Sequence, residues 1–331
     1  MKHLLMQENI TNDDLKKVIN FLKKEPRLTA SKKVFEFEKK WSKWLGSRYS
    51  AFVNSGSSAN LISIATLKIL NKNKNKNEVI VPTLTWSSDV SSIIHCGFKP
   101  VFADIQMNTL SMSLENIKNK ITKKTLAIFY THAQGFNGFD NNFLDYIKKR
   151  NIILIEDVCE SHGASFKNKK VGNFGLMSNF SFYYAHHMST IEGGMICTND
   201  FKLYQMLRML RAHGLIRESD DNSLKEEYIN KYNDLNPEFI FAFPAYNVRN
   251  TEIGAIIGRN QLKSLDKNNQ KRNYNNKIFL ENINPRLYRT DFKIEGSSNY
   301  AFNLITKGSN PDFTRELMKK MTNSNIEFRR G

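Results

Sequence analysis

The stretch TLAIFYTHAQGFNGFDNNFLDYIKKRNIILIED, residues 125–157, decides the fold class of this chain. It opens with an apolar run of strand length, TLAIFYTH (125–132), and closes with another, NIILIED (151–157). Between them, residues 143–150 have the apolar spacing of a helix. Two strands joined through a helix predict parallel pairing, because parallel neighbours need a crossover connection.

The same alternation continues on both sides of this unit. Strands are predicted in AFVN (51–54), EVIVPTL (78–84) and PVFADI (100–105). Helices are predicted over 57–70, 87–95 and 114–119. A hairpin-like region (180–198) and a helix over 202–211 follow. Strands that alternate with helices predict an α/β fold, in which helices cover both faces of a large, mostly parallel, mixed sheet.

The two ends of the chain are organised differently. Helices are predicted over 12–24, over 28–45 with a cap near Thr29 or Ser31, and within 247–265. Residues 215–243 are polar and poorly periodic, which predicts a long and functional loop. Residues 278–330 are predicted to alternate strand and helix. We therefore expect an N-terminal helical segment (1–29), a large ligand-binding domain (30–250) and a smaller α+β domain (251–331).

The charge of the chain favours a small anionic ligand over a nucleic acid. Net charge is +17, but the lysines scatter from Lys2 to Lys320. Basic residues do not interleave with aromatic ones as they would in a nucleic-acid groove, so no nucleic-acid partner is expected. A positive field would still favour a substrate that carries a diphosphate.

Compartment and metal content follow from other simple features. The longest apolar runs, such as Ile152–Ile155, are too short to span a bilayer, and residues 1–17 lack the pattern of a signal peptide. A cytoplasmic protein without a membrane partner is therefore expected. Cys96, Cys159 and Cys197 form no CxxC pair, which predicts no zinc ribbon or disulfide framework, and three cysteines cannot hold a four-cysteine iron–sulphur cluster.

The segment NSGSSAN (54–60) is a candidate anion site. A strand ends there, a Gly/Ser turn follows and a helix begins, so backbone N–H groups and hydroxyls converge. An ordinary helix N-cap would give the same pattern. Trp86 follows the next strand, where parallel sheets bind ligands, and its indole could stack on a flat ring or fill a core. Asp157, at the end of NIILIED, could hold a pyridinium nitrogen protonated or cap a helix.

A further candidate segment is SNFSFYYAHHMSTIEGGMICTND (178–200). Ser181 could bind a phosphate, and the pair His186–His187 precedes the turn Glu192-Gly193-Gly194. A metal site is the alternative for paired histidines. On an extended strand, however, adjacent side chains point to opposite faces and seldom bind one metal together, so no metal is expected.

Taken in order, NSGSSAN, PTLTW, IED, SFxxxH and EGG resemble the sugar aminotransferases of the DegT/DnrJ/EryC1/StrS family over about residues 30–270. The resemblance implies an aspartate-aminotransferase-like fold (pyridoxal-phosphate fold type I) and a homodimer with shared active sites. It also implies a role for each of the following residues. By this resemblance the cofactor phosphate is bound by Gly56, Ser57 and Ser181, and the phosphate of the neighbouring subunit is reached by Asn247. The cofactor ring stacks on Trp86. Its nitrogen meets Asp157, and its hydroxyl lies near Glu160.

One departure from the family pattern changes the expected reaction. Family aminotransferases have a Schiff-base lysine where this chain has His186, and no lysine lies between Lys170 and Lys202. An imidazole forms no Schiff base but accepts protons near neutral pH. This pattern resembles a minority branch, the nucleotide-linked 4-keto-6-deoxyhexose 3-dehydratases, and within it the iron-free type that acts on GDP-4-keto-6-deoxy-D-mannose.

That branch implies pyridoxal 5′-phosphate or pyridoxamine 5′-phosphate as cofactor, L-glutamate as amino donor and loss of the sugar's C3 hydroxyl in deoxysugar and lipopolysaccharide synthesis. His186 is then the catalytic base, and His187 is expected to face away from the ring. Two alternatives stay open: a family member with non-covalent pyridoxamine phosphate and another activity, or a non-catalytic binder of nucleotide sugar or cofactor. Relatives are expected to continue beyond Gly331, which would leave the small domain truncated.

Overall fold

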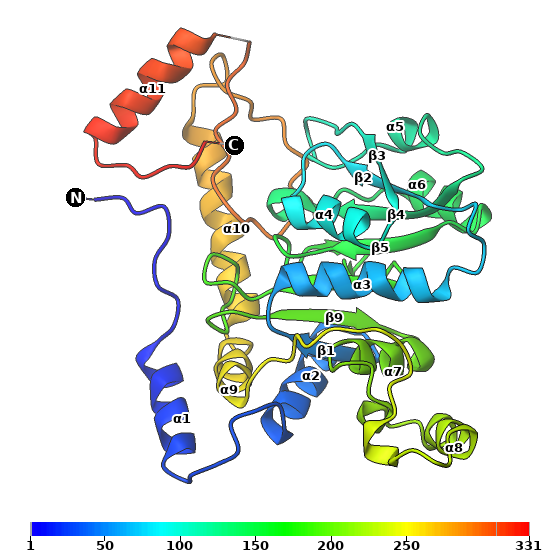
Figure 1. The fold of residues 1–331 in the computed structure, drawn as a ribbon. Helices are drawn as coiled ribbons and strands as arrows, with labels where there is room; N and C mark the ends of the chain where they lie inside the picture. The colour runs from blue at the N-terminus through cyan, green and yellow to red at the C-terminus, as the bar shows by residue number, and fades with distance from the viewer. Residues whose placement is uncertain (1, 309, 331) are drawn as a thin grey trace.

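A seven-stranded sheet forms the centre of the computed structural model, which describes residues 2–308 and 310–330 (Figure 1). Its strands are β1 (Tyr49–Val53), β2 (Glu78–Pro82), β3 (Lys99–Ala103), β4 (Thr125–Thr131), β5 (Ile153–Asp157), β8 (Met177–Ser181) and β9 (Gly194–Thr198). They lie in the order β1-β9-β8-β5-β4-β2-β3. Only β9 runs against the others, since its pairings with β1 and β8 are antiparallel and all remaining pairings are parallel. The predicted mostly parallel mixed sheet is confirmed.

Helices cover both faces of the sheet. One face carries α3 (Gly56–Leu70), α4 (Ser87–His95) and α7 (Phe201–Leu210), and the other carries α2 (Lys32–Leu45), α5 (Leu114–Lys118), α6 (Asn141–Lys149) and α9 (Glu252–Gln261). Successive strand residues alternate between the two cores: Val79 and Val81 enter one and Ile80 the other. This two-sided burial explains why the strands other than the edge strand β3 are continuous apolar runs.

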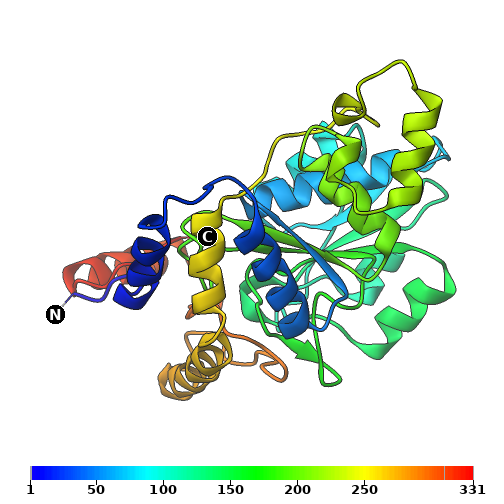
Figure 2. The same cartoon turned by 90° about the horizontal axis from the view of Figure 1, so that it is seen from below.

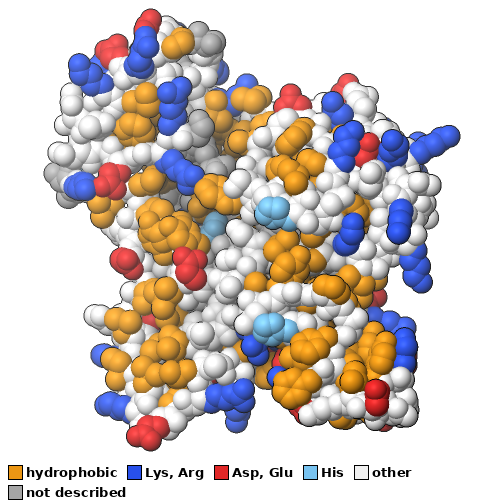
Figure 3. Space-filling model, viewed as in Figure 1, with side chains coloured by type: hydrophobic (Ala, Val, Ile, Leu, Met, Phe, Trp, Pro, Cys, Tyr) orange, Lys and Arg blue, Asp and Glu red, His pale blue; other side chains and the backbone are white. Residues whose placement is uncertain are grey.

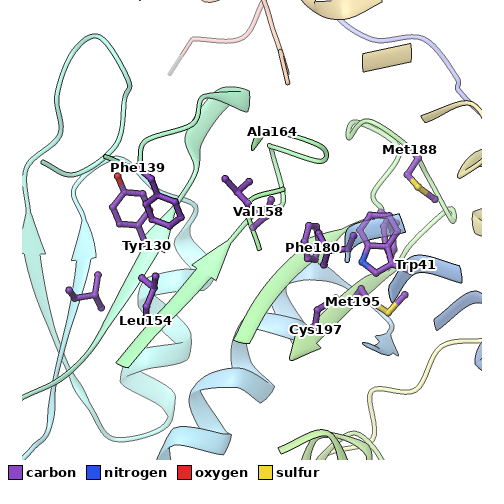
Figure 4. Packing of buried hydrophobic residues seen from close by; sticks show 14 of the residues in the cluster. Trp41, Tyr130, Phe139, Leu154, Val158, Ala164, Phe180, Met188, Met195 and Cys197 are labelled. Atoms are coloured by element: carbon purple, nitrogen blue, oxygen red, sulfur yellow. The ribbon is translucent and has the colours of Figure 1, made fainter. Parts of the chain in front are cut away.

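Trp41 of α2 is a central residue of one core. Its ring lies edge-on to Phe180 and Phe182, with centroids 5.1 and 4.8 Å apart, and Met195 and Cys197 lie beside it (Figure 4). Phe180 belongs to β8 and Phe182 follows it directly, so this packing supports the loop that leaves the end of β8.

The start of α2 is anchored by a side chain distant in sequence. Ser31 is its N-cap residue but makes no capping hydrogen bond through its side chain. Instead the Glu252 carboxylate accepts from the backbone N–H groups of Ser31 (3.0 Å), Lys33 (2.9 Å) and Val34 (2.9 Å). A carboxylate at a helix N-terminus also meets the positive end of the helix dipole. This contact ties α9 to α2.

Two regions differ from the sequence-based expectation. Residues 215–243 contain α8 (Asn222–Lys231) between the short 3₁₀ turns η2 (Ile216–Glu218) and η3 (Pro237–Phe239). No residue of α8 is buried, which explains why apolar periodicity did not reveal it. The strands predicted within 278–330 are wrong for the described residues. There α10 (Leu265–Asn282) and α11 (Pro311–Asn323) flank a segment with only an isolated bridge, Tyr288 with Thr306, and a positive-φ glycine at each of two turns.

The helices α1 (Asn12–Leu22), α10 and α11 lie on the same side of the sheet domain, with α1 and α11 at opposite ends of that side in Figure 1 (see also Figure 2). The two ends of the chain meet there, since the N–H of His3 donates to the Asn325 carbonyl and that of Glu327 donates to the His3 carbonyl, both at 2.8 Å. The remaining short elements are β6 (Ser165–Phe166), β7 (Lys169–Lys170) and η1 (Ala133–Gly135).

The surface shows no concentration of basic charge on the face drawn in Figure 3, where Lys and Arg side chains are dispersed. Among the helices of the described residues, none combines the length and apolarity required to cross a membrane.

Candidate active site

The predicted site residues follow the carboxyl ends of parallel strands. Gly56 comes after β1, Trp86 after β2, Asp157 ends β5 and Ser181 ends β8. Gly194 of β9 pairs with the last residue of both β1 and β8, so these two strand ends flank it at the same edge. Open α/β sheets bind ligands at this edge. The structure therefore brings these four residues to one edge of the sheet.

The start of α3 forms an anion site together with Ser181. Ser55 caps the helix by accepting from the N–H of Ser58 (3.0 Å), while the N–H groups of Gly56 and Ser57 have no acceptor among the described residues. A Cβ atom on Gly56 would lie 2.5 Å from the Cβ of Ser181. Glycine at position 56 is thus what lets the Ser181 hydroxyl approach the free donors. Free N–H groups and a hydroxyl at a helix N-terminus suit a phosphate.

Trp86 presents an open indole at the start of α4. Its side chain is 54% exposed, so it does not fill the core. The Arg329 guanidinium lies over the ring, 5.1 Å from its centroid. Arg329 was missed by the sequence reasoning, and no local pattern could have revealed it, because the pairing of His3 with residues 325–327 is what brings this end of the chain to the edge.

The two acids at the end of β5 have different surroundings. Glu156 is buried and accepts from the N–H groups of Gly172 (2.6 Å), Phe174 (2.7 Å) and Gly175 (2.6 Å), so it anchors a loop. Asp157 is also buried, but it lies at the edge where the site residues meet. Only the second acid of the pair is placed for a ligand.

Asp157 belongs to a buried polar network that sequence reasoning missed. The Asn60 amide nitrogen of α3 donates to Asp157 Oδ2 (2.9 Å) and to Asp89 Oδ1 (2.6 Å). Asp89 is completely buried, and its other oxygen contacts the hydroxyls of Thr85 and Thr131. Burial, and then the Asp157 charge, raise the pKa of Asp89 well above its usual range. In the sequence, Asp89 looks like an ordinary acid in the first turn of a helix.

The paired histidines lie in a bend after β8, not on an extended strand, so the expected alternation between opposite faces is wrong. Both rings lie near His162, with centroids 6.1 Å (His186) and 5.2 Å (His187) from it. His187 is buried and its Nε2 donates to the Ser298 carbonyl at 3.0 Å. Within residues 2–308 and 310–330, no group of three or more His, Cys, Asp or Glu side chains is arranged to hold a metal.

His186 is a neutral imidazole near neutral pH. Burial lowers its pKa to about 4, although the Asp157 charge acts in the opposite direction. Its Nδ1 is buried without a partner, and its Nε2 makes no hydrogen bond to the described residues. The Tyr300 ring lies 5.5 Å from the His186 ring, between centroids. The side chain can therefore accept a proton from a bound molecule.

Glu160 and Asn247 lie in different settings. The Glu160 carboxylate accepts from Gln134 through its backbone N–H (2.8 Å) and its side chain (3.2 Å), and burial raises the pKa of Glu160. Arg329 is among the charges that act on it. Asn247 is exposed, accepts from Arg249 Nε (3.1 Å) and belongs to the segment that pairs with the end of β1. A contact of Asn247 with another subunit stays a prediction.

Together these features fit pyridoxal phosphate or its amine form. The free N–H groups at Gly56 and Ser57 suit the phosphate, the exposed face of Trp86 suits the ring, and a carboxylate at Asp157 suits the ring nitrogen. The position where this cofactor is usually attached holds His186.

Comparisons with known proteins agree with this geometry. Residues 8–330 match the DegT/DnrJ/EryC1/StrS aminotransferase family. The chain is 36% identical over 327 residues to GDP-4-keto-6-deoxy-D-mannose 3-dehydratase from Escherichia coli O55:H7, covering 96% of this chain and 83% of that protein. It is 37% identical over 311 residues to the protein of that name from Yersinia pseudotuberculosis, covering 91% and 77%.

Solved structures give the same result. The E. coli enzyme with bound hydrated pyridoxal phosphate superposes with a TM-score of 0.86 at 32% identity, covering 99% of this chain and 85% of that chain. A form of that dehydratase with a trapped adduct of pyridoxal phosphate and glutamate superposes with a TM-score of 0.85, with the same identity and coverage.

Proposed function

We propose that this protein is a dehydratase dependent on pyridoxal or pyridoxamine phosphate. The chain belongs to the DegT/DnrJ/EryC1/StrS aminotransferase family, and it carries His186 where the cofactor lysine is expected. Its substrate is a nucleotide-linked 4-keto-6-deoxyhexose, GDP-4-keto-6-deoxy-D-mannose in the first instance, from which the C3 hydroxyl leaves. The product is a 3-deoxy-4-keto sugar for deoxysugar or lipopolysaccharide synthesis. The single observation that carries the proposal is a neutral imidazole, His186, in the bend after β8.

Each part of the cofactor has a binding group in the chain. The start of α3 and Ser181 hold the phosphate, and Asp157 holds the ring nitrogen protonated. Trp86 stacks on the ring, and Glu160 lies near the ring hydroxyl. A bound cofactor would supply an amine that can react with the sugar's C4 ketone and a ring that can accept electrons.

His186 moves the proton. Its Nε2 is free, so it accepts the proton released beside the ring while the C3 hydroxyl departs. The pKa of His186, about 4, keeps it in the accepting form at neutral pH. An imidazole cannot form a Schiff base, so the residues named above would hold the cofactor without a covalent bond, and L-glutamate would supply its amino group.

A basic side chain and net charge favour an anionic sugar nucleotide. Arg329 lies on the open side of the site, over Trp86, and the chain carries a net charge of +17. A cation at this position would meet the substrate diphosphate or the carboxylates of glutamate. We further propose a cytoplasmic location, where both of these charged molecules are made and used.

The proposed assembly is a homodimer with shared sites. Asn247 is exposed, and so are two large apolar side chains that precede it along the chain: Phe239 and Phe241 are 59% and 57% exposed. Exposed apolar groups of this kind are typical of subunit interfaces. Light scattering coupled to size-exclusion chromatography tests this: a monomer at micromolar concentration would contradict the dimer.

The activity test uses the full chain with pyridoxal phosphate, L-glutamate and GDP-4-keto-6-deoxymannose, followed by mass spectrometry. Loss of the C3 hydroxyl supports dehydration, whereas an amino sugar would identify the alternative, a transaminase with non-covalent cofactor. No turnover with GDP-, CDP- and UDP-linked 4-keto sugars would favour a binding protein. His186→Asn is expected to abolish dehydration and retain cofactor binding. His95→Asn, at an exposed histidine of α4, is the matched control and retains activity.

A further inference from the structure

Three oxygen atoms behind the proposed ring-nitrogen site form a closed triangle. Asp89 Oδ2 contacts the hydroxyls of Thr85 and Thr131, the latter at 2.7 Å, and the two hydroxyl oxygens are 2.8 Å apart. The contacts from Thr131 to Asp89 and to Thr85 have ordinary hydrogen-bond lengths, and the Thr85 hydroxyl also contacts Asp89 Oδ2. A hydrogen bond along each of the three sides would need one proton per side. The two threonines supply only two protons.

The number of protons available favours a protonated Asp89 carboxyl group. If Asp89 were ionised, one side of the triangle would bring two lone pairs together without a proton between them. If Asp89 carries a proton, all three contacts become hydrogen bonds arranged in a ring. The surroundings act in the same direction, because Asp89 is 0% exposed and Asp157 lies near it, with no basic side chain hydrogen-bonded to either among the described residues.

Asn60 links this triangle to the cofactor site. Its Nδ2 has two protons and lies 2.6 Å from Asp89 Oδ1 and 2.9 Å from Asp157 Oδ2, so one amide orients both carboxyl groups. Asn60 itself is buried, and its Oδ1 has no partner among the described residues. Its orientation therefore depends on these acceptors, together with a longer contact to Ser88 (3.2 Å).

We propose that Asp89 is a permanently protonated positioning residue, which fixes Asp157 through Asn60 and leaves Asp157 as the only negative charge of the pair at the ring-nitrogen site. A second charge here would repel Asp157 and favour its protonation, and a neutral Asp157 could not hold a ring nitrogen protonated. The proposal deepens the proposed function and rests on it for the identity of the ligand. The protonation state itself belongs to the protein alone.

The first experiment is infrared difference spectroscopy of the apoprotein near neutral pH. A protonated carboxyl has a carbonyl stretch that carboxylates lack, and this band shifts in D₂O. We expect the band in the wild-type protein, its loss in Asp89→Asn, and its retention in Asp157→Asn. Glu160→Gln is the matched control, since burial also raises the pKa of Glu160. Absence of the band, or its loss in Glu160→Gln but not in Asp89→Asn, would overturn the proposal.

The second experiment titrates pyridoxal phosphate into the variants and follows ring absorbance, which reports protonation of the ring. Asp89→Asn keeps a neutral group with a donor and an acceptor, so the affinity is expected to change by less than about threefold. Asp89→Ala leaves Asn60 and the threonines unpartnered and is expected to weaken binding about tenfold or more. If Asp89→Asn weakens binding as much as Asp89→Ala, a charged Asp89 is required and the proposal fails. If the wild type does not bind the cofactor, the proposed function fails, while the infrared result still decides the protonation of Asp89.

Discussion

Mild acid is expected to destabilise the fold through His187. Burial first, and Arg272 second, lower the pKa of His187 to about 3, whereas the ordinary value is 6.5. Between these two values the unfolded chain binds a proton that the folded chain does not bind. The stability contributed by the neutral imidazole is therefore full above the ordinary pKa and is lost as the pH falls toward the folded value.

The size of the loss follows from this difference. Going from about pH 7.5 to about pH 5, one histidine with these two pKa values costs about 2 kcal/mol of unfolding free energy. The hydrogen bond from Nε2 to the Ser298 carbonyl requires only one ring proton, so a glutamine, which keeps an N–H donor and does not titrate, can replace it.

Urea unfolding of the parent and of His187→Gln at the two pH values tests this reasoning. On acidification, the unfolding free energy of the parent is expected to fall by about 2 kcal/mol more than that of the variant. Comparing the two proteins cancels the contribution of the carboxyl groups that they share. His95→Gln is the control and should follow the parent, because an exposed imidazole is hydrated in both the folded and the unfolded chain. Equal losses in the parent and in His187→Gln would refute the argument that His187 is neutral through burial.

Three further expectations concern the phosphate site, the fold and the missing lysine. Gly56→Ala places a Cβ atom 2.5 Å from the Cβ of Ser181, so a spectroscopic titration should show cofactor affinity reduced about tenfold or more, and unchanged affinity would remove this turn from the phosphate site. Glu252→Ala leaves three N–H groups of the start of α2 without their acceptor and should cost on the order of 3 kcal/mol in urea unfolding, whereas Glu252→Gln should cost less. His186→Lys should form a borohydride-stable pyridoxyl adduct, seen by intact mass, that the parent does not form; an adduct of the same position in the parent would contradict the assigned role of His186.

The alternation of strands and helices along the chain could be predicted because most strands are buried on both faces and form apolar runs between turns. The predicted cofactor residues at strand ends followed from the same logic: Gly56, Asp157 and Ser181 lie where parallel strands end. The helix α8 was not predicted, because none of its residues is fully buried and its only apolar residues are Leu224, Tyr228 and Ile229, too few to give a clear period.

The rest of the site depends on contacts between residues distant in sequence. Arg329 reaches Trp86 because the two chain ends pair, and a hydrogen bond between His3 and Asn325 leaves no pattern in either segment. Asp89 is similar, since an acid in the first turn of a helix is common, and only its contacts with Asn60 and Thr131, which are distant in sequence, make it unusual. A sequence pattern shows how a residue is placed within its own helix or strand. It does not show the contacts that this residue makes with other helices and strands.

The exchange of a lysine for a histidine changes the chemistry only if the histidine stays neutral. An imidazole beside a carboxylate such as Asp157 would ordinarily become protonated and could not act as a base. Here burial outweighs that charge and lowers the pKa of His186, and the nearby Arg272 acts in the same direction. A protonated Asp89 would also help to keep His186 neutral. An ionised Asp89 would add a second negative charge near the His186 imidazole and favour its charged form. The identity of the base and the protonation of the buried acid are therefore parts of the same electrostatic arrangement.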